Sequence, residues 1–414
     1  MNASSQRVQR IYLLLLMLHT LAASFIWGIN TLFLLDAGLS NAGAFAANAC
    51  FTAGMVVFEV PTGVVADTRG RRTSYLLGTL TLAISTLLYL LMWRVSAPFW
   101  AWGLTSAFLG LGFTFFSGAV EAWLVDALTF TGFLREGGRL ESVFAKGEIV
   151  EGAAMLGGSI AGGVLAQETN LGAPYMLRAV VLVITFVLAW TLMRDIGFTP
   201  NLGKSLGREV RHVLGASIEH GLGNPPVRWI MLSAPFTGAV TIYAFYAAQP
   251  YLLDLYGNEE AYSVAGLAAA IVAGAQIVGG LIVPHVGRFF RRRTSVLLAG
   301  TSLSAAVLAT IGLAPGFWNV IVLLVLWGLM FAALTPVRQA YLNGLIPSKE
   351  RATVLSFDSL MGSSGAVGFQ PILGRVADVW GYPISYVCSA AVQALAIPFI
   401  RLARRQQASP DAIS

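Results

Sequence analysis

The amino-acid sequence predicts an all-α integral membrane protein with twelve transmembrane helices. Composition, the length of the apolar runs and the distribution of basic residues lead to this fold class. Of the 414 residues, 56% are hydrophobic and only 11% are charged, whereas a soluble protein carries roughly 25% charged residues. The mean hydropathy is +0.72. A chain with so little charge cannot cover a surface that is solvated by water throughout.

Apolar runs of about 20 residues predict helices that cross a hydrocarbon core roughly 30 Å thick. The chain contains twelve of them, at 11–35, 41–66, 73–93, 97–127, 144–167, 172–193, 228–254, 261–283, 294–314, 316–346, 352–375 and 382–402. The first run is long enough to span, so we expect a membrane helix there and no cleaved signal peptide. Cys50 and Cys388 both lie in apolar runs, which argues against a disulfide framework or a metal site.

Lysine and arginine predict the orientation. With a cytoplasmic N-terminus, nearly all basic residues between the runs fall on the inner side, and the outer connections hold little beyond Arg94 and Arg178. This asymmetry predicts a multi-pass protein of the plasma (inner) membrane with both termini in the cytoplasm. The net charge of +6 is thereby explained by topology, and we expect no nucleic-acid partner.

The longest polar connection predicts the domain organisation. Between 194 and 227, the apolar residues Leu206, Val210, Leu214 and Ile218 recur at helical spacing, which predicts an amphipathic helix on the inner membrane surface. This linker would separate an N-terminal six-helix bundle (1–193) from a C-terminal six-helix bundle (228–414). An internal echo supports two halves: Arg71-Arg72-Thr73-Ser74 is matched by Arg292-Arg293-Thr294-Ser295.

A short charged turn follows the second apolar run. Its pattern is G-x-x-x-D-x-x-G-R-R, formed by Gly63, Asp67, Gly70, Arg71 and Arg72. The pattern resembles the loop between helices 2 and 3 of the major facilitator superfamily, whose members are secondary transporters. The resemblance implies two six-helix bundles related by a pseudo-twofold axis, which work by alternating access.

The same resemblance implies that the turn is a conformational latch. Asp67 would accept hydrogen bonds from amides at the start of a neighbouring helix, where the helix dipole favours an anion. Arg71, and with it Arg69, would pair with acidic groups at the inner ends of other helices, and Asp126 is the candidate partner. The alternative is that these residues only fix topology and solvate the loop.

Acidic residues within the predicted spans are candidates for proton coupling, because ionisable groups in a membrane are costly and mark pathways or proton sites. Glu121 is the first candidate and Glu59, just before Pro61, the second. Glu148 and Glu151 lie near the inner end of the fifth run. Gly110, Thr114, Ser117 and Glu121 would form one face of helix 4. The alternative is that these acids are held by Arg338 or Lys146 and never exchange a proton.

In the superfamily the central cavity is lined mainly by helices 1, 4, 7 and 10, which selects candidate substrate contacts. Aromatic rings with a few polar groups would suit a flat, amphipathic organic molecule, although each of them also fits ordinary packing. The candidates are His19, Trp27, Asn30, Ser117, Tyr243, Tyr246, Gln249, Trp327, Thr335 and Arg338. Arg338 requires a partner, either an anionic substrate group or a carboxylate.

Three further patterns concern the branch of the superfamily. The segment Gly158-Ser159-Ile-Ala-Gly162-Gly163 resembles the G-P-x-x-G-G signature of drug–proton antiporters, with serine in place of proline. The buried arginine that precedes Gly110 in those antiporters is replaced by Ser106. The spacing from Glu59 to Arg72 is similar to that of tetracycline efflux proteins. We expect Gly158 and Gly162 to pack helix 5 against helix 8.

These features favour a proton-coupled exporter of small amphipathic compounds or drugs, acting as a monomer. The first alternative is a proton-coupled importer of a small metabolite. A membrane-embedded enzyme or a receptor belongs to another class, and the sequence contains none of the metalloprotease, hydrolase or nucleotide-binding motifs that an enzyme would need. The expected partners are the lipid bilayer, protons and a small-molecule substrate, with no cofactor.

Overall fold

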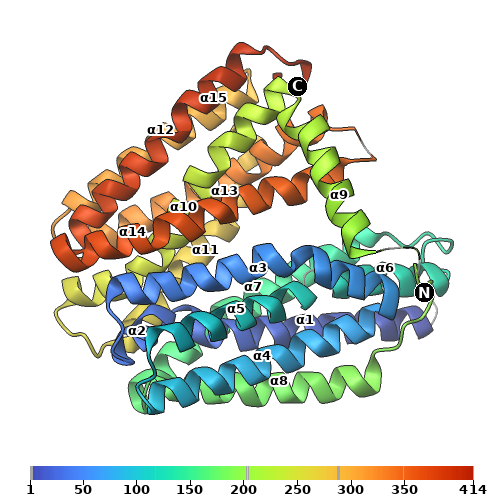
Figure 1. The fold of residues 1–414 in the computed structure, drawn as a ribbon, viewed down its shortest axis with the longest axis horizontal. Coiled ribbons are helices and arrows are strands. Elements are labelled where there is room, and N and C mark those ends of the chain that lie inside the picture. Colours follow the sequence, from blue (N-terminus) through green and yellow to red (C-terminus); the bar gives the residue numbers. More distant parts are fainter. Residues whose placement is uncertain are drawn as a thin grey trace. The chain divides into compact units, whose positions relative to one another are not determined.

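A computed structural model describes residues 3–116, 118–201, 203, 205–286, 290–347 and 349–413. These ranges are almost entirely helical, and strand pairing within them is limited to one isolated bridge between Arg292 and Ala412 (Figure 1). Eleven helical stretches in the described ranges are long and apolar enough to cross a membrane. The last one, Thr353–Arg405, has 53 residues and contains a break at Gly381, where φ is 80° and two helices meet. The expected all-α membrane fold is confirmed.

The chain forms two compact units, one made of Met1–Phe33, Ala53–Glu209 and Tyr262–Ala270, the other of Leu34–Thr52, Val210–Ala261 and Ile271–Ser414. The helices of the first unit are α1 (Ala3–Trp27), the C-terminal part of α3 (Asn41–Arg69), α4 (Arg71–Arg94), α5 (Phe99–Phe116), α6 (Ala119–Phe130), α7 (Leu140–Glu168) and α8 (Gly172–Leu192). Within this unit α1 packs against α7 and α8, and α4 packs against α5 and α8 (Figure 1). Leu15, Tyr75, Trp123 and Val143, each from a different helix, meet in its apolar core.

The fourth predicted span is interrupted. The helix ends at Phe116 and restarts at Ala119, because Gly118 adopts a left-handed conformation with φ of 70°. Glycine populates this region without the steric cost that a Cβ brings. The continuous polar face that we expected from Gly110 to Glu121 is therefore wrong, and Glu121 lies instead in the first turn of the new helix α6.

Glycines on α7 permit close helix contacts, but not with the partner that we expected. A Cβ on Gly158 would lie 2.6 Å from the Ser24 Cβ, and one on Gly162 would overlap with the Phe25 carbonyl oxygen, so both face α1. Gly163 is the residue that faces the eighth predicted span, which is α11 (Tyr262–Val286) in the structure. A Cβ on Gly163 would lie 2.9 Å from the Gly266 Cα of that helix. The small residues of α7 thus serve two neighbours on adjacent faces.

The second unit contains the remaining helices. They are α10 (Pro225–Tyr256), α12 (Arg293–Leu313), α13 (Phe317–Leu345), α14 (Arg351–Ala394), α15 (Ala396–Arg405), the short helices Ser217–Leu222 and Ser409–Asp411, most of α9 (Leu206–Ala216) and of α11, and the C-terminal end of α2 (Asn30–Asp36). α10 and α14 pack tightly because Gly238 and Gly362 face each other: a Cβ on Gly238 would lie 2.7 Å from the Gly362 carbonyl oxygen. The packing of α10 against α14 is the most extensive helix contact in this unit.

Three helix N-termini receive an aspartate from elsewhere in the chain. Asp195 accepts the Arg72 amide at 2.8 Å at the start of α4, and Asp411 accepts the Thr294 amide at 2.7 Å at the start of α12. Asp378 accepts the amides of Asn41 and Ala42 at the start of α3. A carboxylate at this position satisfies unpaired amides and interacts favourably with the helix dipole.

Candidate functional site

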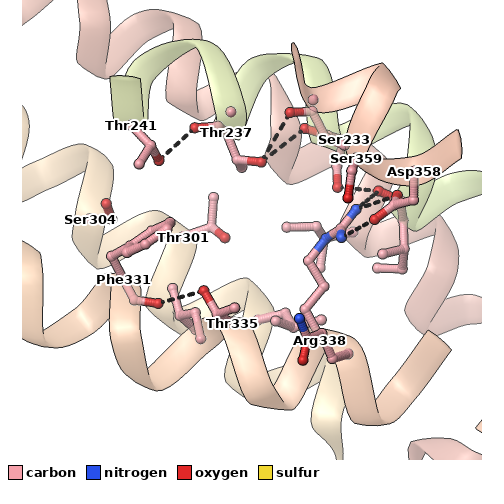
Figure 2. Close-up of a pocket in the computed structure, with 18 of the residues that line it drawn as sticks. Ser233, Thr237, Thr241, Thr301, Ser304, Phe331, Thr335, Arg338, Asp358 and Ser359 are labelled. Carbon is pink, nitrogen blue, oxygen red and sulfur yellow. Dashed lines mark hydrogen bonds and ion pairs between the residues drawn. The ribbon is translucent and has the colours of Figure 1, made fainter. Parts of the chain in front are cut away.

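A cavity of about 410 Å³ lies within the second unit and is the candidate functional site (Figure 2). Side chains from α10, α12, α13, α14 and α15 line it. One part of its wall is apolar and includes Trp327 and Phe331, whose rings stack with centroids 6.3 Å apart. Other parts carry hydroxyl and amide groups. An amphipathic lining of this kind binds a molecule that has both a hydrophobic body and a few polar atoms.

The charged element of the cavity is an ion pair between Arg338 of α13 and Asp358 of α14 (Figure 2). Both guanidinium nitrogens bond the carboxylate, with Nη2 2.7 Å from Oδ1, and Nη2 also donates to the Ile230 carbonyl at 3.3 Å. Asp358 is only 5% exposed. The pair is bidentate, the geometry in which arginine and carboxylate bind most strongly. It leaves the cavity electrically neutral at this point.

The hydroxyl groups of α10 form a regular series along the cavity. Ser233, Thr237 and Thr241 follow one another at four-residue spacing and therefore share one helix face (Figure 2). Each donates its proton to a backbone carbonyl of the preceding turn: Ser233 to Ile230 at 2.6 Å, Thr237 to Ala234 at 3.2 Å, and Thr241 to Thr237 at 2.9 Å. Thr335 of α13 bonds the Phe331 carbonyl in the same way at 3.0 Å.

The structure distributes the expected cavity residues unevenly. Trp327, Thr335 and Arg338 line the cavity. Tyr243, by contrast, is fully buried and bonds the Ser385 hydroxyl and the Leu373 carbonyl, so it packs α10 against α14. Tyr246 and Gln249 lie on α10 outside this lining, and Ser117 lies outside the described residues. Tyr243 therefore does not contribute to this cavity, since its hydroxyl is used within the helix packing.

The candidates on helix 1 lie in the first unit. The His19 ring stacks on Phe116 with centroids 3.4 Å apart, and its Nδ1 is buried without a hydrogen-bond partner in the described part of the chain. Asn30 accepts a hydrogen bond from the Tyr175 hydroxyl at 3.0 Å, while Trp27 is half-buried at the end of α1. His19 and Asn30 thus each contact an aromatic side chain.

Three of the candidate carboxylates lie near one another. The groups of Glu121, Glu148 and Glu151 all interact electrostatically with the Tyr12 hydroxyl, and Glu151 also interacts with Glu121. The Oε2 atom of Glu121 is buried and has no hydrogen-bond partner among the described residues. Glu59 is separate: it lies half-buried on α3, and its carbonyl accepts a bond from Thr62. We call these three carboxylates of α6 and α7, which all influence the Tyr12 hydroxyl of α1, the acidic cluster of the first unit.

The charged turn is organised by ion pairs and by the segment after α8. Arg71 Nη1 lies 2.6 Å from Asp67, and its Nε lies 3.8 Å from Asp126, the partner that we had selected. The Asp67 side chain pairs with Arg71, whereas the amides at the start of α4 are capped by Asp195 instead. Gly70 has φ of 105°, and a Cβ there would overlap the Asp195 carboxylate, so only glycine fits. Arg69 and Gly63 are exposed.

Sequence reasoning missed three charged residues. Asp358 lies in a predicted span twenty residues after Arg338. The requirement that a buried arginine be paired is the signal that could have identified it. Arg178 was assigned to an outer connection, but it lies within α8, is 2% exposed and packs over the Phe113 ring. Asp195 follows α8 in a loop whose position depends on tertiary folding. No periodicity marks such a residue in advance.

Comparison with known proteins places the chain in a family. The model described as Major Facilitator Superfamily matches residues 12–292 and 261–413. Multidrug resistance protein MdtG of Citrobacter koseri is 27% identical over 340 residues, which cover 80% of this chain and 77% of that protein, and MdtG of Salmonella choleraesuis is 26% identical over the same coverage.

Solved structures show the same fold at lower sequence identity. The nucleoside transporter NupG superposes with a TM-score of 0.77 at 12% identity, covering 95% of this chain and 98% of NupG. A bacterial homologue of the human lysosomal transporter Spinster reaches 0.73 at 14% identity, covering 100% and 99% of the two chains. The match of the family model across both halves shows that this multi-pass membrane protein belongs to the Major Facilitator Superfamily.

Proposed function

We propose that the protein is a secondary active transporter that exports small amphipathic compounds or drugs in exchange for protons. The observation that carries this proposal is the amphipathic cavity, in which the aromatic pair Trp327 and Phe331 shares one space with hydroxyl groups and a neutral ion pair. The similarity to proteins named for multidrug resistance covers 80% of the chain, and it supports export. We infer that it acts as a monomer in the inner membrane. The distribution of basic residues predicts that both of its termini lie in the cytoplasm.

Proton coupling is assigned to the acidic cluster of the first unit. Glu121 is the leading proton carrier because its buried carboxylate has an oxygen without a hydrogen-bond partner in the described residues. Glu148 and Glu151 lie within electrostatic range and would influence its charge, since like charges in a low dielectric oppose one another. Glu59 is the second candidate.

Transport by inside-out membrane vesicles tests the proposal. An acid interior provides the proton gradient, and accumulation of a panel of fluorescent lipophilic drugs, including a tetracycline, is followed with and without an uncoupler. Accumulation that the uncoupler abolishes supports proton-coupled export. If the folded, inserted protein accumulates none of the compounds, the alternative of a proton-coupled importer of a small metabolite takes precedence, and right-side-out vesicles with a metabolite panel would identify it.

The charged turn is proposed to be the conformational latch. Asp67 and Arg71 form an ion pair 2.6 Å long, and Asp126 adds a second carboxylate 3.8 Å from Arg71. Asp67→Asn weakens this network while conserving size, so we expect vesicle transport to fall about tenfold or more at unchanged expression. Arg94→Gln, a charge removal at the other end of the adjoining helix α4, is the control. Equal transport by Asp67→Asn and wild type would contradict the latch.

A further inference from the structure

The hydrogen-bonding character of the cavity points to the chemistry of its substrate. Ser233, Thr237, Thr241 and Thr335 all donate their protons to carbonyls of their own helices. What each hydroxyl still offers to the cavity is therefore its oxygen lone pairs, which accept hydrogen bonds. We call these four residues the acceptor series. A ligand that donates to them leaves the helix bonds intact, whereas a ligand that accepts from them must break a bond first.

The donors that belong to the cavity's ion pair are already in use. The guanidinium of Arg338 is directed to both oxygens of Asp358 and to the Ile230 carbonyl. Its positive charge is matched by the Asp358 carboxylate, so it does not repel a cation as an unpaired arginine would. Thr301 and Ser304 on the facing helix α12 also line the cavity, and their hydroxyls can accept as readily as donate.

The side chain of Gln393, on α14, independently indicates a ligand in the cavity. This residue lines the cavity, is only 6% exposed, and its carboxamide oxygen has no hydrogen-bond partner within the described residues. A buried acceptor without a partner is unfavourable, and a bound donor would relieve this. Gln393 therefore supplies one more acceptor in the same cavity.

We propose that the cavity selects protonated amines that carry an aromatic or other planar ring. An ammonium group has three donors and no acceptor, so it matches the acceptor series and Gln393 and leaves no polar atom of its own unpaired. A hydroxyl group in its place would bring an acceptor that finds no free donor in the acceptor series or in the ion pair. The rings of Trp327 and Phe331 cover the ligand's planar part and attract its positive charge. This inference rests on the proposed transport function and names the substrate class of the same site.

The spacing of the acceptor series adds a length preference. Residues four apart on a helix are separated by about 6 Å along its axis, so Ser233, Thr237 and Thr241 extend over about 12 Å. An amine on a flexible chain can reach one of these oxygens while its ring remains against Trp327 and Phe331. Figure 2 shows the three hydroxyls on one side of the space and Phe331 on the other.

A matched pair of probes tests the proposal. Dansylcadaverine carries a fluorescent planar ring and a primary ammonium, and its N,N,N-trimethyl analogue keeps the ring and the charge but has no N–H donor at that nitrogen. We expect vesicles to transport the primary amine with a KM about tenfold below that of the analogue, since two or three hydrogen bonds are lost. Equal KM values would show that charge and ring alone are recognised and would overturn the proposal.

Substitutions in the acceptor series sharpen the test. Thr237→Val replaces the hydroxyl by a methyl group, so we expect it to raise the KM of dansylcadaverine about fivefold and to leave that of the trimethyl analogue unchanged. Thr310→Val is the matched control, because Thr310 of α12 bonds the Ala306 carbonyl in the same way but is exposed outside the cavity. A parallel rise for both probes in Thr237→Val would contradict the proposal.

The outcomes separate this inference from the proposed function. If the drug panel is transported but neither dansyl probe is, the transporter assignment stands and the selection of amines is wrong. If no compound of either set is transported by the inserted protein, the proposed export function itself fails. Selection of the primary amine together with its loss in Thr237→Val supports both.

Discussion

The ion pair of Arg338 and Asp358 shows how a single residue decides the properties of the cavity. Asp358 is 5% exposed, and its two oxygens are both occupied by the guanidinium. Removing charges from water is expensive, and bidentate hydrogen bonding is what compensates for it. The pair therefore contributes less net stability than its short contacts suggest, and its main effect is to set the polarity of the site.

Arg338→Ala leaves the Asp358 carboxylate buried without its partner. We expect this variant to lose about 3–5 kcal/mol of unfolding free energy, because the uncompensated charge remains. The double variant Arg338→Met with Asp358→Leu should regain most of that loss, since no buried charge is left. Chemical unfolding of the detergent-purified proteins measures the difference. A double variant as unstable as Arg338→Ala would show that packing, rather than charge, is lost.

Asp195 is a second residue whose environment has a measurable consequence. Burial raises its pKa above the ordinary value, and the Arg72 amide together with the arginine side chains only partly offsets this effect. A carboxyl group whose pKa is raised on folding binds protons more tightly in the native state. The native state therefore loses stability as pH rises from the ordinary pKa through the raised one.

Asp195→Asn removes this titration and retains an oxygen that can accept the Arg72 amide. We expect the stability of the wild type relative to the variant to be highest near pH 4, to decline as the pH rises, and to become constant once Asp195 is fully ionised. Parallel unfolding curves between pH 4 and 7 measure it. A difference that grows with pH would mean that the ionised form is the better cap.

At the level of whole elements, the sequence predicted helices well and their contacts poorly. The apolar runs locate the spans because the thickness of the membrane fixes how many apolar residues a helix needs. The helix break at Gly118 was not predicted, since an isolated glycine in an apolar run is also compatible with a continuous helix. The partner of Gly158 and Gly162 was wrong for a related reason: small residues announce a close contact but do not say which helix makes it.

The glycines of α7 give a prediction at this scale. Gly162→Ala places a Cβ on the Phe25 carbonyl of α1, so α1 and α7 must separate, and overpacking of this kind costs about 1–3 kcal/mol. Gly157→Ala lies on the same helix where no atom is within 4 Å, and we expect it to be neutral or slightly stabilising. Thermal unfolding in detergent compares the two. Equal losses would indicate that helix propensity, rather than contact with α1, sets the effect.

The same capping arrangement at a helix N-terminus occurs in both halves of the chain. The echo between Arg71-Arg72-Thr73-Ser74 and Arg292-Arg293-Thr294-Ser295 marks the starts of α4 and α12, and each start is capped by an aspartate from a segment that follows a later helix: Asp195 after α8 and Asp411 after α15. The basic residues were visible as a repeat in the sequence. The aspartates were not visible as a repeat. They lie at different distances along the chain from the ends of α8 and α15, and they contact α4 and α12 only after folding.

The separation of chemistry between the halves leads to the last prediction. The acidic cluster of Glu121, Glu148 and Glu151 belongs to the first unit, whereas the cavity with Arg338 belongs to the second. If protons and substrate are handled by different units, removal of the proton carrier abolishes coupling but leaves the substrate site intact. Glu121→Gln keeps the size of the side chain and cannot exchange a proton.

We therefore expect Glu121→Gln to reduce proton-driven accumulation in inside-out vesicles at least tenfold while retaining exchange of labelled for unlabelled substrate across the membrane without a gradient. Glu168→Gln is the matched control, because Glu168 is an exposed acid at the far end of α7. Loss of both activities in Glu121→Gln would make the residue a structural one, since exchange needs no proton. Retention of both would move the coupling role to Glu59, the candidate that lies outside the cluster.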